Sequence, residues 1–150
     1  MKLQEQLVET YLTHIEGCAV IPQLQVHRLP TGQAWSATID FLAIDLAGQS
    51  LQIVEVSSSR KLEKAAQLAR SLGGAHRERL ERCIRESVLH GVLSDWVLRW
   101  RFFVRAGLAD VLRCEDQFAA YRDARGAEAE IVTLEHVFNT LRDRLDRLGA

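Results

Sequence analysis

The chain has 150 residues, of which 47% are hydrophobic and 26% are charged, as in an ordinary globular protein of one domain, residues 1–150. Its net charge of −1 gives no overall signal for nucleic acid binding, although a local basic surface stays open. The three cysteines are scattered, and no apolar run reaches the roughly 20 residues that span a bilayer. We therefore expect a cytoplasmic protein with reduced thiols and no membrane segment.

In the first part of the chain, one segment has apolar side chains at helical spacing, and three further segments are apolar runs typical of strands. The predicted elements are, in chain order, a helix over residues 2–16 and strands over residues 18–28, 34–46 and 50–57. Pro22 favours an edge position or a bulge in the first strand. A turn is predicted at Pro30, Thr31 and Gly32, and a tight hairpin turn at Ala47 and Gly48.

The rest of the chain is predicted to begin with two consecutive helices, of which the first carries apolar residues from Leu62 to Leu72 and ends at Gly73 and Gly74. Ser57, Ser58 and Ser59 are N-cap candidates for the next helix. The elements predicted after it are a helix over residues 75–90, a strand over 96–105, a helix over 108–125, a strand over 130–133 and a last helix from residue 134. A three-strand meander followed by a crossover predicts a mixed sheet covered by helices, an α/β fold of mixed α+β type.

Asp40 and Glu55 interrupt the two apolar strands of the predicted hairpin. With a loop of two or four residues, residue 44 pairs with 51 and 42 with 53, so that Asp40 faces Glu55 with Cβ atoms roughly 5 Å apart. Two facing carboxylates repel each other, and burying a carboxylate is costly unless something neutralises it. A divalent cation is the simplest neutraliser, so the pair predicts a metal site.

This order of elements, with its two acidic strands, resembles the PD-(D/E)XK nuclease superfamily, which has the restriction-endonuclease-like fold. The family core is α-β-β-β-α-β, with an acidic residue on the second strand and Glu or Asp, any residue and Lys on the third. Ile39–Asp45 resembles the second-strand motif and Ile53–Ser57 the third-strand motif. The resemblance covers roughly residues 1–105 and leaves a C-terminal α-β-α extension.

The resemblance implies a nuclease or nuclease-like protein that hydrolyses phosphodiester bonds in DNA or RNA. Its metal would be Mg²⁺ or Mn²⁺, held by Asp40, Glu55 and the carbonyl of Val56, since Mg²⁺ prefers oxygen ligands and keeps several waters. Gln67 stands where some nuclease families of this fold keep a glutamine near the site. Glu5, beside the apolar stripe of the first helix, is a further candidate carboxylate.

One position departs from the family motif, because Ser57 stands where the family has its lysine. Two outcomes follow. A lysine from the next helix takes its place, with Lys61 as the first candidate and Lys64 as the second. Otherwise the site is inactive, and the protein is a scaffold or regulator that binds a protein partner, nucleic acid or a second copy of itself.

Each candidate also has a purely structural interpretation. A buried Asp can cap a turn or pair with an Arg, and Lys61 and Lys64 have the character of surface lysines. Arg99, Arg101 and Arg105 share one face of a predicted strand, where they would either meet a phosphate backbone or, as we favour, pair with acidic side chains of neighbouring helices. The apolar stripe of the last helix would pack on the sheet or form an interface.

Overall fold

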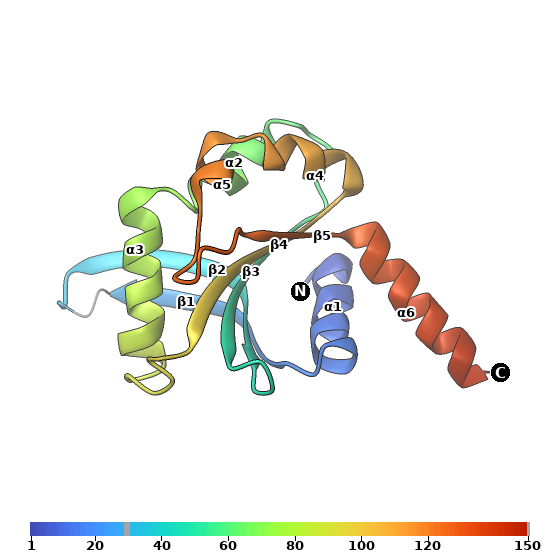
Figure 1. Cartoon of the computed structure of the whole chain (residues 1–150), viewed down its shortest axis with the longest axis horizontal. Helices are drawn as coiled ribbons and strands as arrows, with labels where there is room; N and C mark the ends of the chain where they lie inside the picture. The colour runs from blue at the N-terminus through green and yellow to red at the C-terminus, as the bar shows by residue number, and fades with distance from the viewer. Residues whose placement is uncertain (29–30, 150) are drawn as a thin grey trace.

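A five-stranded mixed sheet in the order β1-β2-β3-β4-β5 forms the centre of the protein (Figure 1). The structure is a computed structural model that describes residues 1–28 and 31–149. Its strands are β1 (Ala19–Arg28), β2 (Ala34–Asp45), β3 (Ser50–Ser57), β4 (Val97–Val104) and β5 (Glu130–Thr133). The predicted α/β class is therefore confirmed. Pro30, part of the predicted turn at residues 30–32, lies outside the described residues.

The first three strands form an antiparallel meander, whereas β4 and β5 run parallel to β3. In the β2–β3 hairpin Leu42 pairs with Ile53 and Ile44 with Leu51, which confirms the predicted register. β1 is an edge strand, as Pro22 indicated. Within this strand Gln23, the residue after Pro22, has a positive φ of 52°.

Helices cover both faces of this sheet (Figure 1). On one face lie α1 (Leu3–Thr10), which continues as a π-helical turn over Tyr11–Ile15, and α6 (Leu134–Gly149). The other face carries α2 (Lys64–Arg70), α3 (Gly74–Cys83) with its own π-helical turn Ile84–Val88, α4 (Ala106–Arg113) and α5 (Asp116–Ala120). Among residues 1–28 and 31–149, no helix has the length and apolar character that crossing a membrane requires.

Two predicted helices differ from the structure. The helix expected over residues 108–125 is divided into α4 and α5 and ends at Ala120, because the backbone is extended from Tyr121. The serine run at 57–59 does not cap α2, which begins at Lys64 after Glu63. The hydroxyl groups of Ser57 and Ser59 instead accept the N–H groups of Ser59 and Lys61, and these local bonds compete with helix formation.

Candidate functional site

Asp40 and Glu55 lie where β2 and β3 stop pairing. The ladder between the two strands ends at Phe41 and Val54, one step before the two acidic residues. Beyond it the N–H of Val56 donates to the Oδ2 atom of Asp40 over 2.7 Å, so a side chain takes the place of the strand backbone. At this end of the hairpin Glu55 lines a cavity together with Lys64 and Gln67 of α2.

The two carboxyl groups lie close enough for each to change the pKa of the other. Two neighbouring buried carboxyl groups do not both ionise readily, because burial and a like charge both disfavour the charged form. Burial raises the pKa of Glu55 well above its ordinary value, and the charge of Asp40 raises it further. Burial also raises the pKa of Asp40, but the hydrogen bonds from Val56 and Glu55 oppose that rise. Glu55 is therefore the member of the pair that holds its proton more firmly.

Lys64 is the cation that acts on this pair. Its charge lowers the pKa of both Asp40 and Glu55 and thus partly offsets the effect of burial. The Nζ atom of Lys64 donates to Oε1 of Gln67 over 3.1 Å, one turn further along α2. This bond holds the two side chains together on the face of α2 that is directed toward Glu55.

A cavity of about 220 Å³ brings Glu55, Lys64 and Gln67 together. Its wall combines polar and apolar groups, and the other lining residues are Ala37, Thr38, Leu68, Ser71, His76, Leu80 and Trp100. Thr38, Ser71 and His76 did not emerge from the sequence as site residues. His76 packs against Trp35 with ring centroids 5.6 Å apart. This contact joins α3 to β2, and no pattern within either segment predicts it.

The remaining predicted residues lie outside this cavity. Lys61 is exposed in the segment before α2, and its backbone N–H donates to Ser59. Ser57 is buried at 7% exposure and contributes no charge. The carboxylate of Glu5 accepts the N–H of Lys2 at the start of α1 and a bond from Gln23 over 3.4 Å. Its charge still raises the pKa of Asp40, so Glu5 borders the site without joining the carboxyl pair.

The donors at this site suit a hard divalent cation. Within the described part of the chain, no three His, Cys, Asp or Glu side chains gather as a metal-binding group. Two carboxyl groups and a backbone carbonyl are nevertheless oxygen ligands of the kind that Mg²⁺ prefers, with water completing the shell. A strand residue directs its N–H and C=O toward the same neighbouring strand, so the carbonyl of Val56 also faces the Asp40 side. A cation bound there would take the place of the proton of Glu55.

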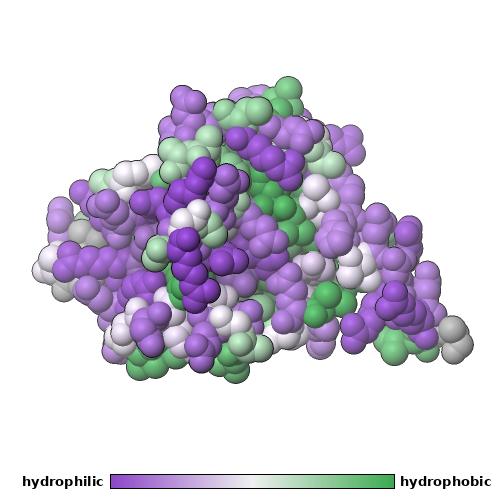
Figure 2. Space-filling model, viewed as in Figure 1, coloured by the Kyte–Doolittle hydropathy of each residue, from purple (hydrophilic) through white to green (hydrophobic). Residues whose placement is uncertain are grey.

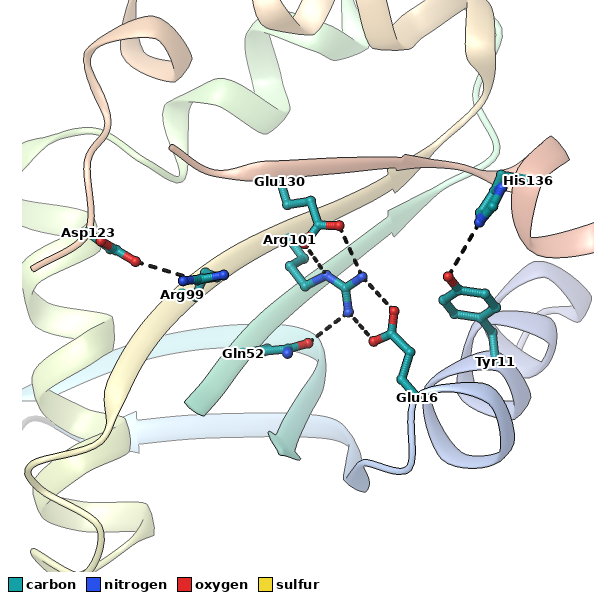
Figure 3. A network of polar contacts seen from close by, with 8 residues as sticks. All are labelled: Tyr11, Glu16, Gln52, Arg99, Arg101, Asp123, Glu130 and His136. Carbon is teal, nitrogen blue, oxygen red and sulfur yellow. Dashed lines mark hydrogen bonds and ion pairs between the residues drawn. The ribbon is translucent and has the colours of Figure 1, made fainter. Parts of the chain in front are cut away.

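The arginines of β4 belong to a separate network on the α1 side of the sheet (Figure 3). Arg101 is 3% exposed, and its guanidinium bonds Glu16 over 2.6 Å, Gln52 over 2.9 Å and Glu130 over 3.1 Å. Arg99 pairs with Asp123 over 3.5 Å. Arg105, directly after β4, donates to the backbone carbonyl of Ser58 and not to an acidic side chain. For Arg99 and Arg101 the predicted pairing with acidic side chains is confirmed, although Asp123 lies in a loop and Glu130 in β5 and not in neighbouring helices.

In comparisons with known proteins, no protein-family model, no curated protein and no solved structure matches the chain.

Proposed function

We propose that this chain is a metal-dependent nuclease that hydrolyses phosphodiester bonds in DNA or RNA, with Asp40 and Glu55 as carboxylate ligands of Mg²⁺ or Mn²⁺. The observation that supports the proposal is the interacting pair of acidic side chains, of which Glu55 lines a cavity together with Lys64 and Gln67. Perturbed titratable groups in a cavity are more frequent at functional sites than elsewhere. The resemblance of the two acidic strands to the PD-(D/E)XK motif supports the same activity.

In this proposal the carboxyl pair has to lose its proton before it can hold a cation. Glu55 would release that proton on binding, since metal ligands are deprotonated. The bound cation would supply an activated water and neutralise charge on the phosphate. The hydrogen bond from Val56 fixes one oxygen of Asp40, so the orientation of this ligand is set before metal or substrate arrives.

Lys64 would take the role of the lysine that the motif lacks at Ser57. Its ammonium group already acts on Asp40 and Glu55, and the bond to Gln67 limits its freedom. A positioned cation stabilises the negative charge that develops on a phosphate in the transition state. Lys64 lines the cavity with Glu55, whereas Lys61 is exposed before α2, so we propose Lys64 for this role.

The charge near the cavity also favours a phosphate-bearing partner. Residues 60–70 contain four cations, Arg60, Lys61, Lys64 and Arg70, and a single carboxylate, Glu63. This segment is positive although the whole chain has a net charge of −1. A local basic surface of this kind attracts the backbone of nucleic acids. We place the activity in the cytoplasm, as the scattered cysteines suggest.

Cleavage assays test this proposal. Purified protein is incubated with labelled single-stranded and duplex DNA and RNA in Mg²⁺, in Mn²⁺ and in EDTA. We expect cleavage that needs metal and is lost in Asp40→Asn. Asp45→Asn is the matched control, because Asp45 lies on the same strand and accepts the N–H of Gly48 in the hairpin turn, at the other end of the hairpin from Asp40. Failure to cleave any substrate would favour a catalytically inactive scaffold or regulator instead.

A further inference from the structure

α6 is attached to the body of the protein by its first half only and projects beyond it (Figure 1). Val137 is 1% exposed and packs in the cluster with α1 and β4. From residue 142 to 149 every side chain is exposed. Two of these are leucines, Leu145 at 68% and Leu148 at 76% exposure. The second half of the helix therefore presents apolar side chains that its own chain does not cover.

These leucines continue a regular apolar stripe. The residues of the stripe are Leu134, Phe138, Leu141, Leu145 and Leu148. Their spacing of four, three, four and three residues is the repeat of a helix that packs along its length against another helix. Charged residues flank the stripe in its exposed half. The pattern predicts a helical partner rather than a flat surface.

The base of the same stripe opens into a groove. A cavity of about 430 Å³ lies between α1 and α6 and is bordered by Leu3, Leu7, Leu134 and Phe138. Leu3 is 70% and Phe138 53% exposed, so its apolar wall is open to solvent. Figure 2 shows hydrophobic side chains at the surface over α1 and near the end of α6. The groove and the projecting half of α6 are thus two parts of one apolar surface.

We propose that this surface binds a second copy of the chain, with the two α6 helices antiparallel about a two-fold axis. In such a dimer the projecting half of each helix lies on the groove of the other, and both contacts form at once. With Leu145 opposite Leu134 of the partner subunit, Leu141 lies opposite Phe138 of the partner subunit. Each copy supplies both the apolar side chains and the groove that receives them.

The charges beside the stripe fit this arrangement. In the same register Arg142 lies beside Glu135 of the partner subunit, and the symmetry repeats this pair on the other side of the axis. The carboxylate of Glu135 is exposed, where it accepts the N–H of Ala106, and Arg142 is 56% exposed. Opposite charges at flanking positions select the orientation of paired helices.

Light scattering on the full chain over a range of concentrations tests the dimer. We expect wild-type protein to be dimeric at about 100 µM and Leu145→Glu to weaken association by about tenfold or more, because a charge replaces a buried leucine. Leu46→Glu is the matched control, since Leu46 is 66% exposed in the β2–β3 turn and should leave the dimer intact. A monomeric wild type would mean that this surface receives another partner, and a dimeric Leu145→Glu would mean another interface. Either result would overturn the proposal.

Charge reversal tests the orientation. Arg142→Glu and Glu135→Arg should each dimerise at least about tenfold more weakly than wild type, since each places like charges together twice. An equimolar mixture of the two variants should form a heterodimer, because both flanking pairs are then again of opposite charge. Native mass spectrometry distinguishes the heterodimer from the homodimer of each variant by mass. Circular dichroism checks that Glu135→Arg still folds. A mixture that stays monomeric, or variants that dimerise as wild type does, would contradict the antiparallel register.

Discussion

Asp40 and Glu55 act on each other's pKa at the point where the ladder between β2 and β3 ends. Protonation of Glu55 reduces the two like charges of the pair to one. This proton is held by burial and by the neighbouring negative charge, both of which raise the pKa of Glu55. The same conditions favour a cation in the place of the proton.

The stability of the metal-free protein should therefore depend on pH through Glu55. Its pKa is higher in the folded than in the unfolded chain, so the folded state binds more protons above the ordinary value of 4.5. The free energy of unfolding then falls as the pH rises from that value through the raised pKa. Urea unfolding in EDTA at a series of pH values measures this free energy. In Glu55→Gln the decrease in the free energy of unfolding with rising pH should be smaller.

The control for this pH series is Glu78→Gln, which changes an exposed carboxyl on α3 and should retain the wild-type dependence. Adding Mg²⁺ should restore the stability of the wild type at high pH, since a ligand that binds only the folded state stabilises it. If Glu55→Gln follows the same pH curve as the wild type, Glu55 does not hold the proton.

Lys64 and Lys61 give a matched pair of variants for the catalytic cation. Lys64→Met should reduce kcat by about 10²–10³, the usual effect of losing one group that stabilises transition-state charge. Lys61→Met should remain near wild type, because Lys61 is exposed outside the cavity. Steady-state cleavage kinetics with the preferred substrate measure both. A larger loss of kcat in Lys61→Met than in Lys64→Met would show that Lys61 is the catalytic cation.

Arg101 should matter for stability and not for metal binding. Arg101→Met would leave Glu16, Glu130 and Gln52 without their shared partner, at a cost of about 3–5 kcal/mol in the free energy of unfolding. Arg113→Met breaks an exposed pair with Asp110 and should cost no more than about 1 kcal/mol. Urea unfolding measures both variants. A loss below about 1 kcal/mol in Arg101→Met would show that the network contributes little.

The hairpin was predictable from the sequence because its evidence is local. Alternating apolar residues and the Ala47–Gly48 turn fix the register, and a slip of one residue would turn every side chain to the wrong face. That register brings Asp40 next to Glu55. The raised pKa of Glu55 was not predictable, because it depends on how deeply other parts of the chain bury this side chain.

Whether Lys61 or Lys64 lies at the site depends on the residue at which α2 begins. The serine run indicated a helix start near residue 60, which would have put Lys61 in its first turn. Local bonds of the Ser57 and Ser59 hydroxyls delay the start to Lys64. Lys64 and Gln67 are three residues apart, a spacing that places them on one helix face and could have selected Lys64 in advance.

Long-range contacts set the rest of the structure. Arg101 was recognised as a candidate for ion pairing, but its partner Glu16 lies 85 residues away in the sequence. The division of the predicted helix over 108–125 follows the packing of Leu112 and Phe118 into the core on either side of the break. Neither contact has a signal within its own segment.

Calorimetric titration with Mn²⁺ tests the central claim, that Asp40 and Glu55 form a metal site, most directly. Measured near neutral pH in two buffers of different ionisation enthalpy, wild-type protein should bind one ion and release about one proton, the proton of Glu55. Asp40→Asn and Glu55→Gln should lose this binding, while Asp45→Asn should keep it. Absence of binding in the wild type, or equal affinity in Asp40→Asn, would contradict the account.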